Sequence, residues 1–561
     1  MNAAGLMLSI AQSASQTSSA VADLKMYARF GWGLRGFVRQ RLTVPQAEAI
    51  VRERLEQREA NFLRIVERGI FGYPRSPYIP LLRLAGCELG DLRQMLRDRG
   101  LDATLLVLRE ADVYVSFEEF KGRQPIVRQG RVIPAQPRDF TNPFLRAAYH
   151  SESGGSTGVG SRADIDLDLI AATAPERLLT YAAHGVERAP MALWSGLLPD
   201  ARGMANLLHG VMLGNTPRRW FSTVTSRDQR PPLKFWLASY GIVALARSFG
   251  APAPWPEPMP LERAEIVARW AAGMASARGA CVVRVAVSMA LRIAIAANEA
   301  GIDLSGVVLM GGGEPPTAAK AAVVAHSGAR WVPMYAFAEV GPVAAGCANP
   351  SDANDLHFLD GTLALIQYSR AVPGFGLEVP AFHFTTLLPS APKLLLNVES
   401  DDYGTIEPST CGCPLERWGL RTHLRHIRRF RKLTGEGVTL IGGEMEHILE
   451  SVLPQRFGGS PLDYQLHEEE DEQGFTRLSL LVSPRVHLSD EAEVIATVLA
   501  ALERGSASAH AAGIVWKQAR TLRVIHAEPI WTARGKLMPL HLSRRAASVS
   551  HTELSSPNPN E

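Results

Sequence analysis

The sequence predicts an α/β protein with a large N-terminal domain, built from parallel α/β sheets and a β subdomain, and a small α+β C-terminal domain. Between residues 150 and 345, short apolar runs alternate with glycine-rich turns and alanine-rich helical segments, a pattern typical of parallel sheets. Residues 355–430 contain short apolar strands separated by turn residues, which favours a mainly β subdomain. Beyond about residue 433, helical and strand-like segments are mixed.

Length and composition limit the class of protein. The chain has 561 residues, enough for two to four domains, and 46% apolar with 20% charged residues is typical of a globular protein. A net charge of +3 is too balanced to indicate a nucleic-acid partner. Five cysteines are too few for a disulfide-stabilised secreted protein, which favours a reducing compartment.

No targeting or membrane segment is predicted. No uninterrupted apolar run approaches the roughly 20 residues that span a bilayer. The first 20 residues have no Lys or Arg ahead of their weak apolar patch, which is atypical of a signal peptide. We therefore expect a cytoplasmic protein without a membrane span.

The first third of the chain is expected to be mostly helical. Residues 21–75 and 76–110 carry apolar residues at three- and four-residue spacing. The alternating, β-branched stretch Val113–Phe117 predicts a strand. The apolar run Cys281–Ala297, interrupted by two arginines, predicts a helix.

The clearest α/β unit follows residue 300. Gly306–Met310 predicts a buried strand, Thr317–Ser327 a helix and Trp331–Tyr335 a further strand. Leu363–Gln367 and Lys393–Val398 predict strands of the β subdomain.

The C-terminal region predicts a small α+β domain. Met445–Leu453 and Asp490–Arg504 predict helices, Arg477–Ser483 a strand, and the acidic stretch Glu468–Glu472 a hairpin or loop. The Ser-, Pro- and Asn-rich end is expected to be a disordered tail. The predicted organisation is thus an N-terminal part at 1–140, a core at 141–432, a small domain at 433–545 and a tail at 546–561.

The loop 153–160 (SGGSTGVG) is a candidate phosphate site. It contains four glycines and three hydroxyl residues, so backbone N–H groups and hydroxyls can surround phosphate oxygens. It is not a Walker loop, because no Gly-Lys-Ser/Thr follows. An ordinary Ser/Gly-rich loop remains the alternative.

Three further motifs carry groups suited to a nucleotide. The segment 312–316 (GGEPP) directly follows the strand ending at Met310, where ligands bind in open α/β sheets; a plain turn is the alternative. In 335–341 (YAFAEVG), Glu339 suits a magnesium ion held by a carboxylate and nucleotide phosphates. Lys536, after a glycine, is suited to neutralise charge during attack on a phosphate, although such a lysine is more often a surface charge.

In this order the four motifs resemble those of the adenylate-forming superfamily, which includes acyl-CoA synthetases, adenylation domains and luciferases. Its members carry a loop similar to S-S-G-T-T-G-x-P, then G-G-E-P, Y-G-x-T/S-E, a ribose-binding Asp and a Gly-Lys near the C-terminus. The resemblance covers roughly residues 145–540. It implies ATP, magnesium and a carboxylic acid as ligands, and a mobile C-terminal domain that rotates between two half-reactions.

The resemblance also implies roles for individual residues. The adjacent Asp401 could replace Asp402 as the ribose ligand. By position, the implied phosphate ligands are Ser153, Gly155, Ser156, Thr157 and Gly158. The implied adenine site consists of Gly312, Gly313, Glu314 and Pro315, with Tyr335 stacking on the base. The resemblance further implies that Asp402 binds the ribose, Glu339 binds magnesium and Lys536 acts in adenylation.

Within the superfamily the chain looks most like the phenylacetate-CoA ligase branch. The run 340–347 (VGPVAAGC), and a C-x-C followed by Arg-Thr-His, are similar to that branch. The branch suggests a structural zinc site, because three thiolates and one imidazole form a closed tetrahedral set. Buried inert cysteines are the alternative. The implied ligands are Cys347, His357, Cys411 and Cys413.

The expected activity is ATP-dependent activation of an acid through an acyl-adenylate, followed by acyl transfer to CoA. A carrier-protein phosphopantetheine or an amine are alternative acceptors. A third alternative is a nucleotide-binding homologue without catalysis, because Ala338 stands where the superfamily carries Thr or Ser. Oligomeric state and the identity of the acid are not encoded in these motifs.

Overall fold

The structure is a computed structural model of the 561-residue chain. It describes residues 28–145, 149–152, 162–224, 231–313, 316, 318–372, 377–408, 410–429, 433–435, 438–440, 448–459, 463–470, 476–504, 513–514, 516–518, 521–530 and 540–542. None of the helices in these ranges is long and apolar enough to cross a membrane.

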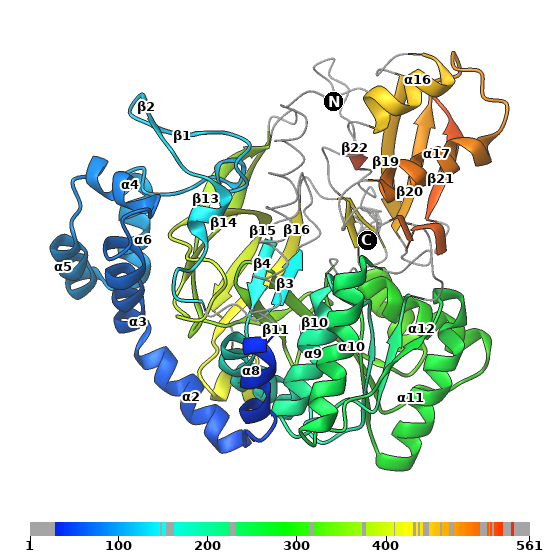
Figure 1. The fold of residues 1–561 in the computed structure, drawn as a ribbon, viewed down its shortest axis with the longest axis horizontal. Helices are drawn as coiled ribbons and strands as arrows, with labels where there is room; N and C mark the ends of the chain where they lie inside the picture. The colour runs from blue at the N-terminus through cyan, green and yellow to red at the C-terminus, as the bar shows by residue number, and fades with distance from the viewer. Residues whose placement is uncertain are drawn as a thin grey trace, which may run out of the picture.

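The N-terminal region is helical, as predicted. A helix over 28–37 is followed by a chain of short helices that pack beside the antiparallel strands (Figure 1). Their apolar faces bury side chains such as Leu92, Leu96 and Leu105. The helices are α2 (Val44–Glu56), α3 (Arg58–Ile65), η1 (Val66–Phe71), α4 (Tyr78–Leu84), α5 (Leu89–Arg99) and α6 (Leu101–Glu110).

The strand predicted at Val113–Phe117 is wrong. Only Val115 makes an isolated β-bridge, to Val398, and helix α7 (Phe117–Phe120) begins at the end of the predicted strand. The cause is a capping box, in which Ser116 and Glu119 satisfy each other's backbone N–H groups and start a helix. Short elements follow: β1 (Ile126–Arg128), β2 (Arg131–Ile133), η2 (Pro137–Phe140), β3 (Tyr149–Glu152) and β4 (Arg162–Ile165).

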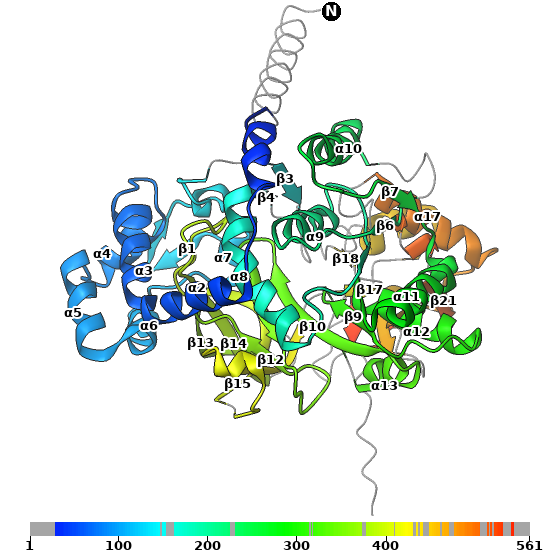
Figure 2. The ribbon, with the colours of Figure 1, turned by 90° about the horizontal axis from the view of Figure 1, so that it is seen from below.

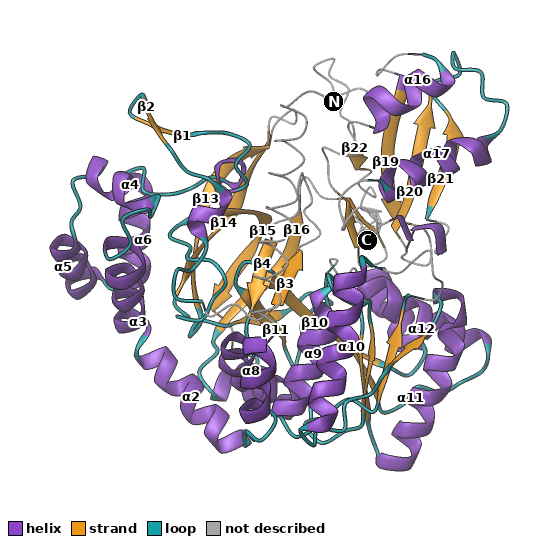
Figure 3. Ribbon diagram, in the orientation of Figure 1, coloured by secondary structure: helices purple, strands orange, loops and turns teal. Residues whose placement is uncertain are grey.

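The central layer is a parallel sheet with helices on both faces (Figure 3). Side chains such as Val282, Val308 and Met310 face α8–α10, while Val283 and Leu309 face α11 and α12. The strands are β5 (Met191–Trp194), β6 (Arg219–Ser222), β7 (Pro256–Pro258), β8 (Cys281–Arg284), β9 (Val307–Gly311) and β10 (Arg330–Phe337). The helices are α8 (Leu167–Ala183), α9 (Ala201–Met212), α10 (Leu233–Ser248), η3 (Leu261–Arg263), α11 (Ala264–Arg278), α12 (Val287–Glu299) and α13 (Ala318–His326).

This region confirms the predicted strand–helix–strand unit as β9, α13 and β10. The helix predicted over Cys281–Ala297 is wrong for its first part. Cys281–Arg284 is strand β8, paired in parallel with β5 and β9, and α12 begins only at Val287. A short, mainly apolar run fits a buried strand and a buried helix equally, and here pairing with the two neighbouring strands selects the strand.

Strand β10 belongs to two kinds of sheet. Residues 330–333 pair in parallel with β9, and residues 334–337 pair antiparallel with β11 (Gly341–Gly346). The whole sheet has twelve strands in the order β13-β14-β15-β16-β12-β11-β10-β9-β8-β5-β6-β7. Figure 2 shows β10 between β12–β15 on one side and β9 with α11–α13 on the other.

The antiparallel part confirms the predicted β subdomain. Its further elements are β12 (Leu356–Phe358), β13 (Leu363–Val372), β14 (Leu377–Thr386), β15 (Val398–Pro408), α14 (Pro414–Arg417) and β16 (Thr422–Arg429). The strand predicted at Lys393–Val398 is wrong, because only Lys393 makes an isolated bridge, to Thr141, and β15 begins at Val398. Asn397 has a φ of 48°, which interrupts an extended backbone.

The C-terminal region has its own four-stranded sheet and core. The predicted strand and the predicted helix near 490–504 are confirmed as β20 and α17. Glu468–Glu470 are the last residues of β19, which pairs antiparallel with β20, so the acidic stretch belongs to a hairpin, one of the two predicted alternatives. The elements are β17 (Leu433–Gly435), β18 (Val438–Leu440), η4 (Ile448–Val452), α16 (Leu453–Phe457), β19 (Tyr464–Glu470), β20 (Thr476–Val482), α17 (Glu491–Glu503), β21 (Leu522–His526) and β22 (Leu540–Leu542).

Candidate functional site

The glycines at the end of β9 lie where the sheet leaves no room for a side chain. A Cβ on Gly311 would meet the carbonyl oxygen of Val285 at 1.6 Å. A Cβ on Gly312 would meet the carbonyl oxygen of Met334 at 1.9 Å. Gly313 has a φ of 96°, a conformation that favours glycine. The Gly-Gly sequence therefore brings together three backbone segments, at the carboxyl ends of β8 and β9 and just after the parallel part of β10.

Tyr335 and Asp402 meet at this edge of the sheet. The Tyr335 hydroxyl donates a hydrogen bond to Asp402 Oδ2 at 2.6 Å, and both side chains are buried. The register of β15 shifts between Tyr403 and Thr405, so the strand is irregular just beyond Asp402. Because neighbouring strand residues point to opposite faces, Asp401 is directed away from this pair. The geometry thus separates the two aspartates, and Asp402 lies beside Tyr335.

The Tyr335 ring packs in the core of the antiparallel part. Its centroid lies 6.0 Å from that of Phe337 and 6.4 Å from that of Phe384. The ring of Tyr335 thus packs against other aromatic side chains, while its hydroxyl makes the polar contact, with Asp402. Stacking of this ring on adenine remains a prediction.

Glu339 lies in the turn after β10 and forms an ion pair that the sequence did not indicate. Its Oε1 is 2.6 Å from Lys121 Nζ, and the side chains are only 7% and 15% exposed. The backbone N–H of Lys393 donates to the Glu339 carbonyl at 3.0 Å, which fixes the turn. A buried carboxylate at this edge is chemically suited to magnesium, but an ion bound to it would share or displace the Lys121 ammonium.

Several predicted residues lie outside the described residues, and their roles remain predictions. The strands flanking the candidate phosphate loop are described: β3 and β4 form a hairpin in which Glu152 pairs with Arg162, so the loop connects two antiparallel strands. The residues outside the description are Ser153, Gly155, Ser156, Thr157, Gly158, Glu314, Pro315 and Lys536.

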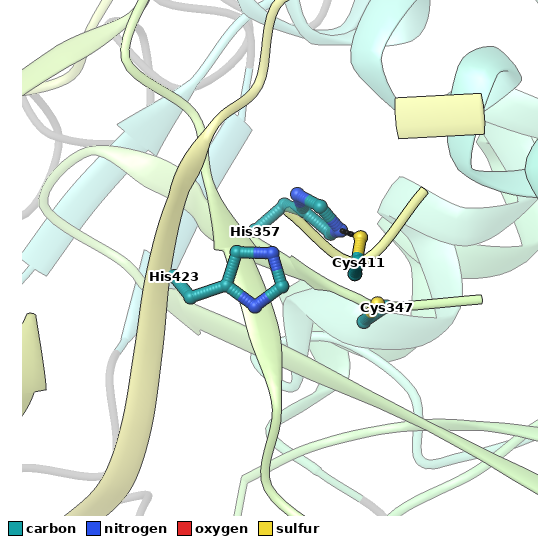
Figure 4. A group of neighbouring side chains, drawn as sticks. All are labelled: Cys347, His357, Cys411 and His423. Carbon is teal, nitrogen blue, oxygen red and sulfur yellow. Dashed lines mark hydrogen bonds between the residues drawn. The ribbon is translucent and has the colours of Figure 1, made fainter. Parts of the chain in front are cut away.

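Three of the predicted ligands, Cys347, His357 and Cys411, gather in one cluster (Figure 4). His357 Nε2 lies 3.6 Å from Cys411 Sγ and 3.1 Å from Cys413 Sγ. Two ligand atoms on a tetrahedral zinc ion are about 3.5 Å apart, given bonds of about 2.3 Å to sulfur and 2.0 Å to nitrogen. The spacing therefore fits a zinc ion.

His423 is a further candidate ligand that the sequence analysis missed. One donor atom each from Cys347, His357, Cys411 and His423 lies within 4.8 Å of the others. His357 and His423 are directly opposite each other on β12 and β16. These four residues thus offer donors to one site, with Cys413 beside His357. Only the register of two distant strands reveals His423 as a member.

Hydrogen bonds hold both imidazoles in the form that binds metal. His357 Nδ1–H donates to the Leu420 carbonyl at 2.6 Å, and His423 Nδ1–H donates to Asp355 Oδ1 at 2.6 Å. Each bond leaves Nε2 with a lone pair, and His423 Nε2 is buried with no hydrogen-bond partner among the described residues.

The sulfur atoms are also prepared for metal binding. The backbone N–H groups of Asn349 and Cys413 donate to the sulfurs of Cys347 and Cys411 at 3.3 and 3.4 Å. The thiol of Cys347 donates to the sulfur of Cys413, which raises the pKa of Cys347 and lowers the pKa of Cys413 below its usual range. Cys413 is thereby stabilised as a thiolate, the form that binds metal.

Comparison with known proteins tests the fold. No family model matches the chain, and no curated protein matches it. The structure of 2-hydroxyisobutyryl-CoA ligase in complex with 2-HIB-AMP and CoA matches with a TM-score of 0.52 and 16% identity, covering 88% of this chain and 90% of that chain. The chain therefore has the fold of that enzyme, which confirms the predicted fold class and the fold implied by the resemblance.

Two other structures match with lower scores. Malonyl-CoA ligase with methylmalonyl-CoA and AMP bound has a TM-score of 0.40 and 15% identity, over 71% of this chain and 74% of that chain. The amide bond synthetase McbA from Marinactinospora thermotolerans has a TM-score of 0.41 and 13% identity, over 83% of this chain and 92% of that chain.

Proposed function

We propose that this chain, with the fold of 2-hydroxyisobutyryl-CoA ligase, activates a carboxylic acid with ATP through an acyl-adenylate. The observation that carries the proposal is the hydrogen bond between Tyr335 and Asp402, two motif residues 67 positions apart. This bond supports a common site for two motifs of the resemblance, near the edge where Gly312 follows β9 and Glu339 follows β10. Ligands of open α/β sheets bind at such carboxyl edges.

The proposed reaction has two steps. An oxygen of the acid attacks the α-phosphorus of ATP, the bond to the bridging oxygen breaks, and pyrophosphate leaves with the electron pair. The thiolate of CoA then attacks the acyl carbon, and AMP leaves. Most of the acceleration is expected from positioning and from charge stabilisation.

The residues have distinct proposed roles. Asp402 binds the ribose hydroxyls, and the Tyr335 hydroxyl orients its carboxylate. Thr157 and its loop hold phosphate oxygens, and the Lys536 ammonium stabilises the charge of the first step. Glu339 would hold magnesium together with the ATP phosphates, and that ion, when bound, supplies positive charge that neutralises them.

CoA is the proposed acyl acceptor, as the resemblance implies. Phosphopantetheine on a carrier protein, or an amine, would use the same adenylate through a different approach to the acyl carbon. Addition of CoA, a carrier protein or an amine to the preformed adenylate distinguishes the three by their products.

A second candidate function is nucleotide binding without catalysis. Two observations favour it: Lys121 already neutralises the carboxylate of Glu339, and Ala338 offers no hydroxyl to an α-phosphate.

Acid-dependent exchange of radiolabelled pyrophosphate into ATP separates the two functions. We expect exchange with at least one acid in a panel, its loss in Lys536→Ala, and a higher KM for ATP in Asp402→Asn. Arg269→Met, an exposed α11 residue, is the matched control. ATP binding without exchange for any acid would establish the second function instead.

We also propose that the cysteine–histidine cluster binds a structural zinc ion. Support comes from the donor spacing, the two oriented imidazoles and the buried, partnerless His423 Nε2. The cluster joins the chain after β11, strand β12, the segment before α14 and strand β16. A closed set of protein ligands of this kind stabilises a fold rather than reacting with substrate.

A further inference from the structure

Arg284 is a charged residue at the end of a buried strand. It is the last residue of β8 and pairs with Leu193 on β5 and Met310 on β9. In a parallel sheet such partners direct their side chains to the same face, here the face covered by α8 and α9. The next residue, Val285, has its carbonyl against Gly311. The Arg284 side chain therefore starts at the edge that carries the proposed adenylate site.

Among the residues that the structure describes, none provides a counter-ion to the buried Arg284 guanidinium. The residue is 7% exposed, and its Nε and Nη1 atoms are buried with no hydrogen-bond partner. Burial lowers the pKa of Arg284 to about 10. Within the described part of the chain, the charged or titratable groups that act on it are Tyr181 and Arg177, and neither is a carboxylate. An uncompensated buried charge of this kind costs several kcal/mol.

A second guanidinium from α8 faces the same region. Arg177 Nη1 donates to Asn206 Oδ1 at 2.8 Å, while its Nε is buried without a partner. The neighbouring His209 provides no negative charge: its Nδ1–H donates to the Ala205 carbonyl, and burial keeps its pKa well below the usual value. The cluster thus has positive charge and free donors, and it is complementary to a carboxylate.

We propose that Arg284, assisted by Arg177, binds a second carboxylate of the acid, so that the preferred substrates are short dicarboxylic acids. This inference rests on the proposed function. On the proposed function the reacting carboxylate must lie near Glu339, just after β10, and β10 is two strand spacings or about 10 Å from β8. A carboxylate paired with a guanidinium is also a weaker nucleophile, so Arg284 suits the end of the acid that does not react.

The test compares acids of equal chain length with the full-length protein. Binding of succinate and glutarate, against butyrate and pentanoate, is measured by calorimetry and by the shift in Tm for wild type, Arg284→Met, Arg284→Lys and the control Arg269→Met. We expect tighter binding of the diacids by wild type and by the control. Loss of a buried charged hydrogen bond predicts about 30-fold or more weaker diacid binding in Arg284→Met, with monoacid binding unchanged.

Removing an unpaired buried charge should not weaken the fold, so we expect the Tm of Arg284→Met without acid to equal or exceed that of wild type. A large fall in Tm would show that Arg284 has a structural partner and would overturn the inference. Equal binding of diacids and monoacids, or diacid binding unaffected by Arg284→Met, would also overturn it. If ATP alone bound or raised the Tm in wild type but not in Arg284→Met, the cluster would bind a phosphate of ATP and not a carboxylate, which would overturn the inference.

Pyrophosphate exchange with the same acids separates this inference from the proposed function. Exchange that is supported by monoacids and insensitive to Arg284→Met retains the function and refutes the inference. Arg284-dependent diacid binding without exchange by any acid refutes the function and retains a diacid-binding site.

Discussion

The ion pair between Lys121 and Glu339 gives the most quantitative prediction. In Lys121→Met, the Glu339 carboxylate, 7% exposed, loses the ammonium 2.6 Å away. Breaking a buried pair in this way costs about 3–5 kcal/mol. The carboxylate can escape part of this cost by binding a proton, which for a glutamate of pKa about 4.3 costs about 3.7 kcal/mol at pH 7. We therefore expect Lys121→Met to lower the free energy of unfolding by about 3–4 kcal/mol at pH 7.

The sign of the pH dependence follows from the same argument. In Lys121→Met the pKa of Glu339 is raised in the folded protein, so the folded state takes up a proton that the unfolded state releases. The loss of stability should then shrink as the pH falls, to about 1 kcal/mol at pH 5, because each pH unit changes the cost of protonation by about 1.4 kcal/mol.

Urea unfolding followed by tryptophan fluorescence at pH 5 and pH 7 measures this effect. Lys121→Arg keeps the charge and serves as the control, and Lys121→Met/Glu339→Gln removes both charges and should recover most of the loss. A change below about 1 kcal/mol at both pH values, or no recovery in the double variant, would refute the buried ion pair.

Three further predictions use other parts of the molecule. Metal analysis of the purified protein should find one zinc ion per chain. The Cys411→Ser variant should lose this zinc and have a lower Tm. The Cys87→Ser variant, which changes a buried cysteine outside the cluster, should retain the zinc. Asp402→Asn should raise the KM for ATP about 10- to 100-fold in pyrophosphate exchange with little change in Tm, since it removes one charged hydrogen-bond acceptor; an unchanged KM would exclude the ribose role. Burial lowers the pKa of His383 to about 3, so the unfolded chain binds a proton below pH 6.5 that the folded chain refuses, and stability should fall as the pH drops from 6.5 towards 3. The urea midpoint of His383→Gln should depend less on pH over this range, and identical pH profiles would contradict the assignment.

The sequence predicted the elements whose pattern is local. Gly306–Met310, Thr317–Ser327 and Trp331–Tyr335 have apolar periods and glycine boundaries that suit only one structure, and all three are confirmed. The stretch Cys281–Arg284 failed because its four residues are compatible with helix and strand, and only pairing with β5 and β9 selects the strand.

The sequence predicted the motifs of the candidate site, but it did not predict which side chains of distant segments contact one another there. The glycines after β9 could be found because steric exclusion acts on adjacent residues of the chain. Lys121, which pairs with Glu339, is 218 residues away in the sequence, and no local pattern connects the two. His423 was missed for a related reason, since its role depends on the register of β12 with β16.

Strand β10 couples the thermal behaviour of the two halves of the large sheet. Its first four paired residues pair with β9, in the parallel half, and its last four pair with β11, in the antiparallel half. If β10 detaches, both halves therefore lose the backbone hydrogen bonds that they make to it. Calorimetry should accordingly record one cooperative transition for the twelve strands, while the sheet formed by β19–β22, which has a separate core, is free to melt at another temperature. A backbone cut between Pro333 and Met334 would uncouple the halves at the single strand they have in common.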